Sequence, residues 1–164
     1  MQRCFLNFVI TSAIVGCALT AAAETHPFNV HDMVAMDRIG DHQPSPDGSM
    51  VAFMVTTMDL EANRGGRNLW LAATDGSVVR QLTTHGSSDV SPRWADARML
   101  YFLSTRSGSS QVWRMAVDGG EAEQVTEVPL DIEAFKIGPG GKALYLGLKV
   151  FADCEDPVPC TVER

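Results

Sequence analysis

The chain has 164 residues, with 13 Lys and Arg against 20 Asp and Glu and a formal net charge of −7. No cluster of Lys or Arg interrupts this acidic composition, so nucleic acid and anionic membrane surfaces are not expected partners. Hydrophobic residues make up 45% of the sequence, which is typical of a folded globular protein and excludes extensive disorder.

The first 23 residues have the composition of a secretory signal peptide. Arg3 is the only charged residue here, and Cys4–Ala23 is apolar or small except for one asparagine and a few hydroxyl side chains. Three alanines precede Glu24, and this small-x-small site predicts cleavage between Ala23 and Glu24. We therefore expect an exported protein, periplasmic or secreted, that has no membrane contact after cleavage.

Two other interpretations of this segment stay open. A retained transmembrane anchor is long enough to span a bilayer, although the weak flanks and the alanine site favour cleavage. Residues 14–17 (IVGC) also resemble the box before the lipidated cysteine of bacterial lipoproteins. In that case Cys17 would anchor the protein to a membrane.

Residues 24–38 form a lead-in segment with a short helix predicted within Asn29–Ile39. Asn29 can cap the start of this helix, and Asp32 lies at capping-box spacing three residues later. Val30, Met33 and Val34 would share one apolar face. Two roles fit this pattern, bracing against another domain and covering an edge of the fold that follows.

One stretch of the chain occurs twice. Asn68–Thr83 reads NLWLAATDGSVVRQLT, and Gln111–Thr126 reads QVWRMAVDGGEAEQVT, 43 positions later and without a gap. Each copy predicts a strand, a turn and a second strand, because Gly adopts the positive φ of a tight turn and Asp bonds its own backbone there. We expect the equivalent residues Trp70 and Trp113 to occupy equivalent positions in a hydrophobic core.

A turn followed by an apolar run precedes each hairpin. The copies are SPDGSMVAFMV (45–55), ADARMLYFLS (95–104) and a third version, GPGGKALYLGL (138–148). Phe53, Phe102 and Leu146 are equivalent in this alignment. The runs are apolar at nearly every position, which favours strands buried on both faces.

A period of roughly 40–45 residues carrying four strands is typical of a β-propeller blade. We therefore predict an all-β fold, a partial β-propeller of about two and a half four-stranded antiparallel blades over residues 39–164. The blades are placed at about 39–85, 89–128 and 132–164, with the last one truncated. The short helix and the signal peptide precede them.

The remaining cysteines are Cys154 and Cys160, which flank two prolines in a five-residue gap. In an exported protein this spacing predicts a local disulfide, and two free thiols are the alternative. A metal site is not expected, because no histidine or third cysteine lies near in sequence.

We predict no catalytic, cofactor-binding or metal-binding residue in this chain. The four histidines (His26, His31, His42 and His85) form no i, i+4 pair beside a glutamate. No serine lies in the G-x-S-x-G elbow of α/β-hydrolases, and no glycine pair has the strand-to-helix context of a phosphate loop. No histidine is expected beside a serine in a recognisable catalytic arrangement.

The runs MVAMDRIGDHQPSPDGSMVAF (33–53), DLEANRGGRNLWLAATDG (59–76) and SPRWADARMLYFLSTRSGSSQVW (91–113) resemble a known family. They are similar to the N-terminal propeller of bacterial exported prolyl oligopeptidase-family enzymes, with the acylaminoacyl-peptidase and dipeptidyl-peptidase-like branch fitting best. The resemblance covers roughly residues 27–164. Its S-P-D-G strand also occurs in TolB-type propellers.

The resemblance implies the propeller part of a two-domain serine peptidase that cleaves short, acylated or aminoacyl peptides. The propeller would filter peptide substrates toward a C-terminal α/β-hydrolase domain, which holds the catalytic Ser, Asp and His and is absent from this chain. The alternative is a periplasmic TolB-like propeller that acts as a protein-binding module.

Overall fold

The computed structural model describes residues 26–164. The predicted signal peptide, its cleavage site between Ala23 and Glu24, and Cys17 lie outside these residues. Within residues 26–164, no helix is both long and apolar enough to cross a membrane.

The strands form three antiparallel sheets in chain order, and each strand pairs with the next one along the chain. The first sheet contains β1 (Arg38–Pro44), β2 (Met50–Asp59), β3 (Arg64–Ala73) and β4 (Val79–Gln81). The second contains β5 (Asp89–Trp94), β6 (Met99–Ser104), β7 (Gln111–Ala116) and β8 (Glu123–Gln124). The third contains β9 (Ile132–Ile137) and β10 (Leu144–Leu148), joined by the 3-10 turn η1 (Pro139–Gly141).

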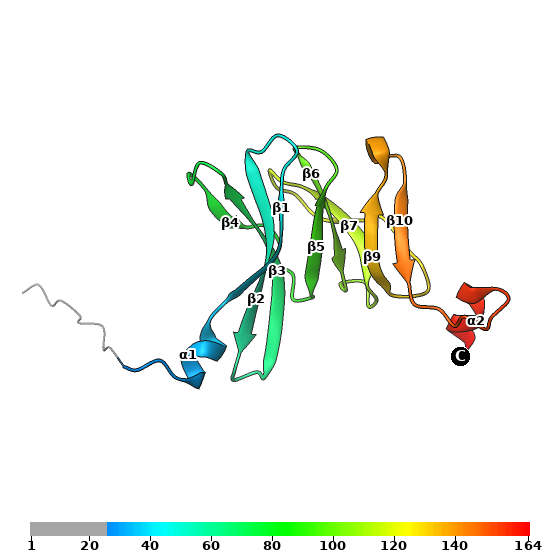
Figure 1. Ribbon diagram of the computed structural model, residues 1–164, viewed down its shortest axis with the longest axis horizontal. Coiled ribbons are helices and arrows are strands. Elements are labelled where there is room, and N and C mark those ends of the chain that lie inside the picture. The colour runs from blue at the N-terminus through cyan, green and yellow to red at the C-terminus, as the bar shows by residue number, and fades with distance from the viewer. Residues whose placement is uncertain (1–25) are drawn as a thin grey trace, which may run out of the picture.

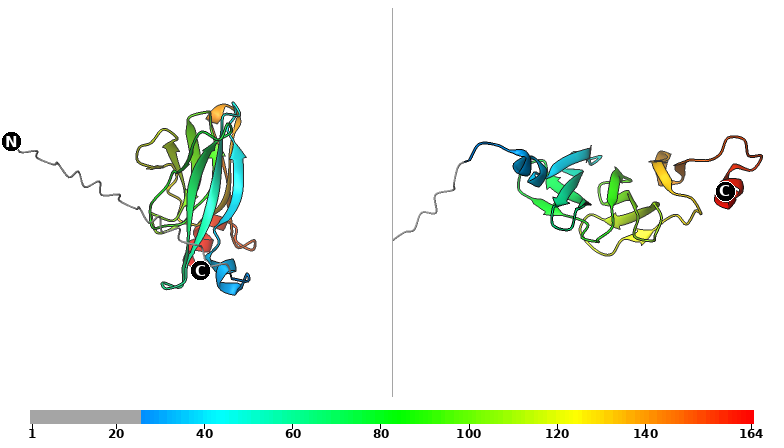
Figure 2. Two further views of the ribbon diagram at one scale, coloured as in Figure 1. Left: turned by 90° about the vertical axis from the view of Figure 1, so that its left-hand side faces the viewer. Right: turned by 90° about the horizontal axis from the view of Figure 1, so that it is seen from below.

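The three sheets stand side by side in a row, as Figures 1 and 2 show. The first strands of the sheets, β1, β5 and β9, are neighbours along this row. The predicted fold class is thereby confirmed: the molecule is all-β and propeller-like, with two four-stranded sheets and half of a third.

The space between the first and second sheets holds one hydrophobic core. Leu69, Leu71 and Ala52 of the first sheet are completely buried there. The second sheet contributes Leu100 and Phe102, which are also inaccessible to solvent. Burial of these side chains joins the two sheets, at roughly 1.5–3 kcal/mol for each large aliphatic or aromatic side chain.

A second core lies between the second and third sheets. It contains Leu103 and Val112 from the second sheet and Ile132 and Phe135 from the third. In β6, Leu103 directly follows Phe102, and in β7, Val112 directly precedes Trp113. Successive side chains of these strands therefore point into opposite cores. The prediction of strands buried on both faces is correct for this sheet.

The two tryptophans of the repeated hairpin do not have equivalent surroundings. Trp113 pairs with Phe102 across β6 and β7 and packs against the first core. Trp70 pairs with Phe53, but it lies between Leu69 and Leu71 along β3 and therefore faces away from the second sheet. The prediction of equivalent core positions is wrong because no described sheet covers this face of the first sheet.

The repeated Gln-x-Thr triplet at the end of each hairpin has a structural reason. The Thr83 hydroxyl accepts a hydrogen bond from the Leu69 N–H at 3.0 Å, and the Thr126 hydroxyl accepts one from Val112 at 2.9 Å. The side-chain amides of the two glutamines donate to the carbonyls of the same threonines. Each triplet thus closes its hairpin after the outer strand has ended, which keeps buried backbone groups paired.

The turns before β2 and β6 are also equivalent, although only the first retains Pro and Gly. The Asp47 carboxylate accepts hydrogen bonds from the Ser45 hydroxyl at 2.6 Å and from the Ser49 backbone N–H at 3.2 Å. In the second sheet, Asp96 accepts from the backbone N–H groups of Arg98 and Met99. An aspartate that bonds its own turn is therefore the shared feature.

The helix α1 (Val30–Ala35) precedes the first sheet. Asn29 caps it, and the Asp32 carboxylate accepts a hydrogen bond from the Asn29 backbone N–H, so the predicted capping box is confirmed. The helix is shorter than the predicted range, because the chain becomes extended at Arg38 and pairs with β2. It contacts β2 but buries none of its residues.

The chain leaves the third sheet after Leu148 and ends in the helix α2 (Pro157–Glu163). The prediction placed this segment in the truncated third blade, but it contains a helix and no strand. Pro157 is the first helical residue, where its missing N–H and fixed φ suit a helix start.

Candidate functional site

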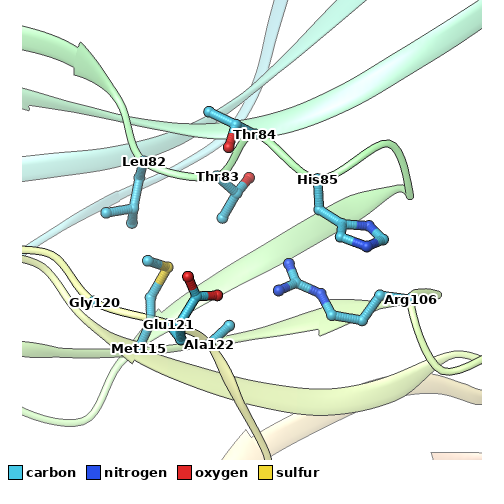
Figure 3. Close-up of a pocket in the computed structure, with 9 residues that line it drawn as sticks. All are labelled: Leu82, Thr83, Thr84, His85, Arg106, Met115, Gly120, Glu121 and Ala122. Carbon is cyan, nitrogen blue, oxygen red and sulfur yellow. The ribbon is translucent and has the colours of Figure 1, made fainter.

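A cavity of about 320 Å³ between the first and second sheets is the first candidate site. Its lining residues are Leu82, Thr83, Thr84 and His85 from the link between β4 and β5, and Arg106, Met115, Gly120, Glu121 and Ala122 from the second sheet. Figure 3 shows the Arg106 guanidinium and the Glu121 carboxylate pointing into the cavity, with Thr83 on the opposite wall.

Arg106 is held in this wall by a buried ion pair. Its Nη2 donates to both carboxylate oxygens of Asp89, at 3.0 and 2.9 Å, and the Asp89 side chain is completely buried. Its Nε donates to the Ser104 hydroxyl at 2.9 Å. The guanidinium also stacks on two rings, 5.4 Å from the centroid of Phe102 and 4.9 Å from that of Trp113.

These contacts assign a structural role to Arg106. They connect the loop between β6 and β7 to the start of β5, and they neutralise a carboxylate that could not be buried alone. This pair was not predicted, because Asp89 and Arg106 are 17 positions apart and no local sequence pattern joins them.

His85, which lines the cavity, lies next to a serine two positions later in the chain. His85 Nδ1 lies 2.8 Å from the Ser87 hydroxyl and accepts from the Ser87 backbone N–H at 3.2 Å. Both contacts form one short turn. Among the described residues no carboxylate hydrogen-bonds the His85 ring, so the third group of a Ser-His-acid arrangement is missing.

The other histidines lie apart from this cavity. His26 and His31 are at α1, where His26 Nε2 lies 3.5 Å from Asp32, and His42 is in β1. Within residues 26–164 there is no group of three or more His, Cys, Asp or Glu side chains placed to hold a metal ion. Thr83, Arg106 and Glu121 supply the polar side chains that face this cavity.

Cys154 and Cys160 are joined in the structure, with their Cα atoms 6.1 Å apart. The bond closes the loop that leads into α2. Thr161 strengthens this closure, since its hydroxyl accepts from the Phe151 N–H at 3.0 Å and donates to the Pro157 carbonyl. Arg164 binds Asp153 and stacks over the Phe151 ring at 4.8 Å.

The sheet order and the repeated hairpins define a β-propeller module. Residues 38–147 match the family model described as the TolB beta propeller domain, which covers more than half of the chain. The chain belongs to this family.

Known relatives include peptidases. The chain is 32% identical over 120 residues to the uncharacterised peptidase YuxL of Bacillus subtilis, covering 70% of this chain and 18% of that protein. It is 31% identical over 113 residues to dipeptidyl-peptidase 5 of Porphyromonas endodontalis, covering 68% of this chain and 16% of that protein. The predicted resemblance to peptidase propellers is confirmed. The chain spans less than a fifth of the length of these curated relatives.

A solved structure links the chain to TolB as well. The structure of a TolB candidate from Agrobacterium tumefaciens is 27% identical, with a TM-score of 0.55, covering 73% of this chain and 41% of that one.

Proposed function

We propose that this chain is the N-terminal propeller of an exported serine peptidase of the prolyl oligopeptidase family. The observation that carries this proposal is the identity of 32% and 31% to two peptidases, over 70% and 68% of this chain. The full protein would hydrolyse short peptides or peptides with acylated or free aminoacyl ends. An α/β-hydrolase domain would supply the catalytic Ser, Asp and His.

In this proposal the propeller controls which peptides reach the hydrolase domain. The supporting feature is the packing of the sheets against one another through two hydrophobic cores. A propeller of packed sheets excludes large folded proteins by size and admits short flexible chains. The sheets described here would contribute one side of such a filter.

The test uses the protein as its host makes it. An antibody raised against residues 38–147 would isolate the native product, which is then treated with a fluorophosphonate probe and assayed on aminoacyl and acylaminoacyl chromogenic substrates. We expect a product much longer than 164 residues that the probe labels and that cleaves the substrates. A native product that neither reacts with the probe nor cleaves peptides would contradict the proposal.

The second candidate is a TolB-like binding module that acts through protein contacts. The likeness to the Agrobacterium structure favours it. The same isolation distinguishes the two candidates, because a binding module would carry a partner protein and no probe label.

Export is part of both candidates. Removal of residues 1–23 predicts a mature protein that begins at Glu24 and is recovered outside the cytoplasm. Amino-terminal sequencing of the native product tests this. A lipid-modified Cys17 would indicate the lipoprotein alternative, and an intact start at Met1 in the cytoplasm would contradict export.

A further inference from the structure

A second cavity, separate from the one that contains Arg106, lies where the first strands of the three sheets, β1, β5 and β9, end. It has a volume of about 300 Å³. Six of the lining residues come from the C-terminal ends of these strands, namely Gln43 and Pro44 from β1, Arg93 and Trp94 from β5, and Lys136 and Ile137 from β9. The seventh is Pro46, in the turn after β1. In Figure 1 these three strands follow one another along the row of sheets.

The charge of this cavity differs from that of the chain. The chain has a formal net charge of −7, but the lining contains two cationic residues and no acidic one. Lys136 is exposed and forms no salt bridge among the described residues. Asp41 offsets the charge of Arg93 at 2.9 Å, so Lys136 supplies the local excess of positive charge, which attracts an anion to this place.

The Arg93 guanidinium is fixed in position but only partly used. Its Nη1 donates to Asp41 Oδ1 at 2.9 Å and to the Pro92 carbonyl at 2.7 Å. Within residues 26–164, its Nε and Nη2 have no hydrogen-bond partner. One edge of the guanidinium is therefore available, and such an edge donates two parallel hydrogen bonds to a carboxylate.

Irregular backbone in β1 supports this arrangement. The pairing of β1 with β2 shifts between Gly40 and Gln43, and Asp41 within this bulge has φ 41°, a conformation that few non-glycine residues adopt. The bulge places the Asp41 carboxylate within reach of β5. The Trp94 indole N–H donates to the Gln43 carbonyl at 2.9 Å, which fixes the neighbouring wall.

We propose that this cavity binds the C-terminal carboxylate of a short peptide. Arg93 receives the carboxylate on its free edge, Lys136 adds positive charge, and the last side chain of the peptide packs against Trp94 and Pro44. The volume suits one or two residues, because small-ligand pockets begin at roughly 300 Å³. The peptide class rests on the proposed function, whereas the preference for an anion rests on the cavity alone.

The test compares two tripeptides that differ only at the C-terminus, one with a free carboxylate and one with an amide. N-methylated peptide bonds prevent their hydrolysis, and titration calorimetry on the full native protein measures both dissociation constants. We expect the free acid to bind about ten-fold more tightly or better, as a charge-assisted bidentate contact provides. Equal affinities would overturn the proposal.

Variants separate a binding role from a structural one. Arg93→Gln should abolish the preference for the free acid, while Lys142→Gln, an exposed lysine in the following turn, should preserve it. Asp41→Asn removes the same ion pair but retains the guanidinium, so it should keep or increase the preference. Loss of the preference in Asp41→Asn and Arg93→Gln alike would show that Arg93 acts only through the fold and would overturn the proposal.

Inorganic phosphate is the control for a general anion site. We expect it to displace the peptide only weakly, and equal binding of phosphate and free acid would overturn the assignment to peptides. Fluorophosphonate labelling of the same preparation reports on the peptidase proposal independently. If the probe labels the protein but the free acid binds no better than the amide, only this inference is refuted. If the probe does not label the protein but the free acid binds better, only the peptidase function is refuted.

Discussion

The first and second sheets contain the same hairpin, but the hairpins have different neighbours. In the second sheet, Phe102 and Trp113 pack against the first sheet. In the first sheet, the equivalent pair Phe53 and Trp70 lies on the face that no described sheet covers. The comparison shows that a repeat fixes strand pairing and turn geometry, while burial depends on which sheet stands opposite.

The largest effect is expected for the matched pair of variants Phe102→Ala and Phe53→Ala, which tests this difference. Phe102 is completely buried between two sheets, so truncation should lower the free energy of unfolding by about 3–5 kcal/mol. Phe53 is half-buried, so Phe53→Ala should lower the free energy of unfolding by clearly less. Urea unfolding of both variants measures the difference. Equal losses would show that another part of the protein covers the outer face of the first sheet.

The ion pair of Asp89 and Arg106 exists only in the second sheet and makes the two sheets unequal in a second way. Asp89→Asn leaves the guanidinium without its counter-charge in a mostly buried position, and we expect a loss of roughly 3 kcal/mol. Thermal unfolding of this variant and of Asp118→Asn, which changes an exposed aspartate in the turn between β7 and β8, measures this loss. A loss no greater than that of the exposed control would contradict the role assigned to the pair.

The third sheet differs from both, since its second strand leads to a disulfide-closed segment in place of a hairpin. We expect Cys154 and Cys160 to be oxidised in the exported protein. Closing so short a loop stabilises by roughly 2–3 kcal/mol in the chain-entropy model, and this affects the segment around α2 more than the sheets. Intact-mass analysis with thiol alkylation, before and after reduction, tests it. Two alkylatable thiols without reduction would exclude the bond.

The closing hydrogen bonds of the hairpins should be alike in the two sheets. Thr83→Val and Thr126→Val each leave a backbone N–H of the adjacent strand unpaired, which costs about 1–3 kcal/mol. We expect the two losses to agree closely in denaturant unfolding. A large difference between them would mean that neighbouring sheets also control this local contact.

The smallest expected effect concerns the turn before β2. The Ser45 hydroxyl, followed by the groups of Ser49, lowers the pKa of Asp47 from 3.8. Because the folded pKa is lowered, its contribution to stability is present above pH 3.8 and is lost as pH falls through the lowered value. Asp47→Asn should therefore be slightly destabilising at pH 7 and neutral at the most acidic pH. A difference that persists there would contradict the assignment.

Much of the fold follows from local sequence. The Asp-Gly turns have their positive φ at Gly76 and Gly119, and the capping box at α1 forms as the spacing of Asn29 and Asp32 predicts. The alignment of Phe53 with Phe102 agrees with the pairing of each phenylalanine to its tryptophan. These features were predictable because each depends on residues that are close together in the chain or on one strand.

Other features depend on the arrangement of the sheets. Three such features are the contact of Arg106 with Asp89, the cavity at the ends of β1, β5 and β9, and the place of Trp70 on the face that no described sheet covers. The sequence alone determined the all-β class, the repeat and the turns, because backbone geometry and hydrogen bonding act over a few residues. Only the tertiary structure decided which faces are buried and which charges meet, because burial and ion pairing depend on neighbours that the local sequence does not specify.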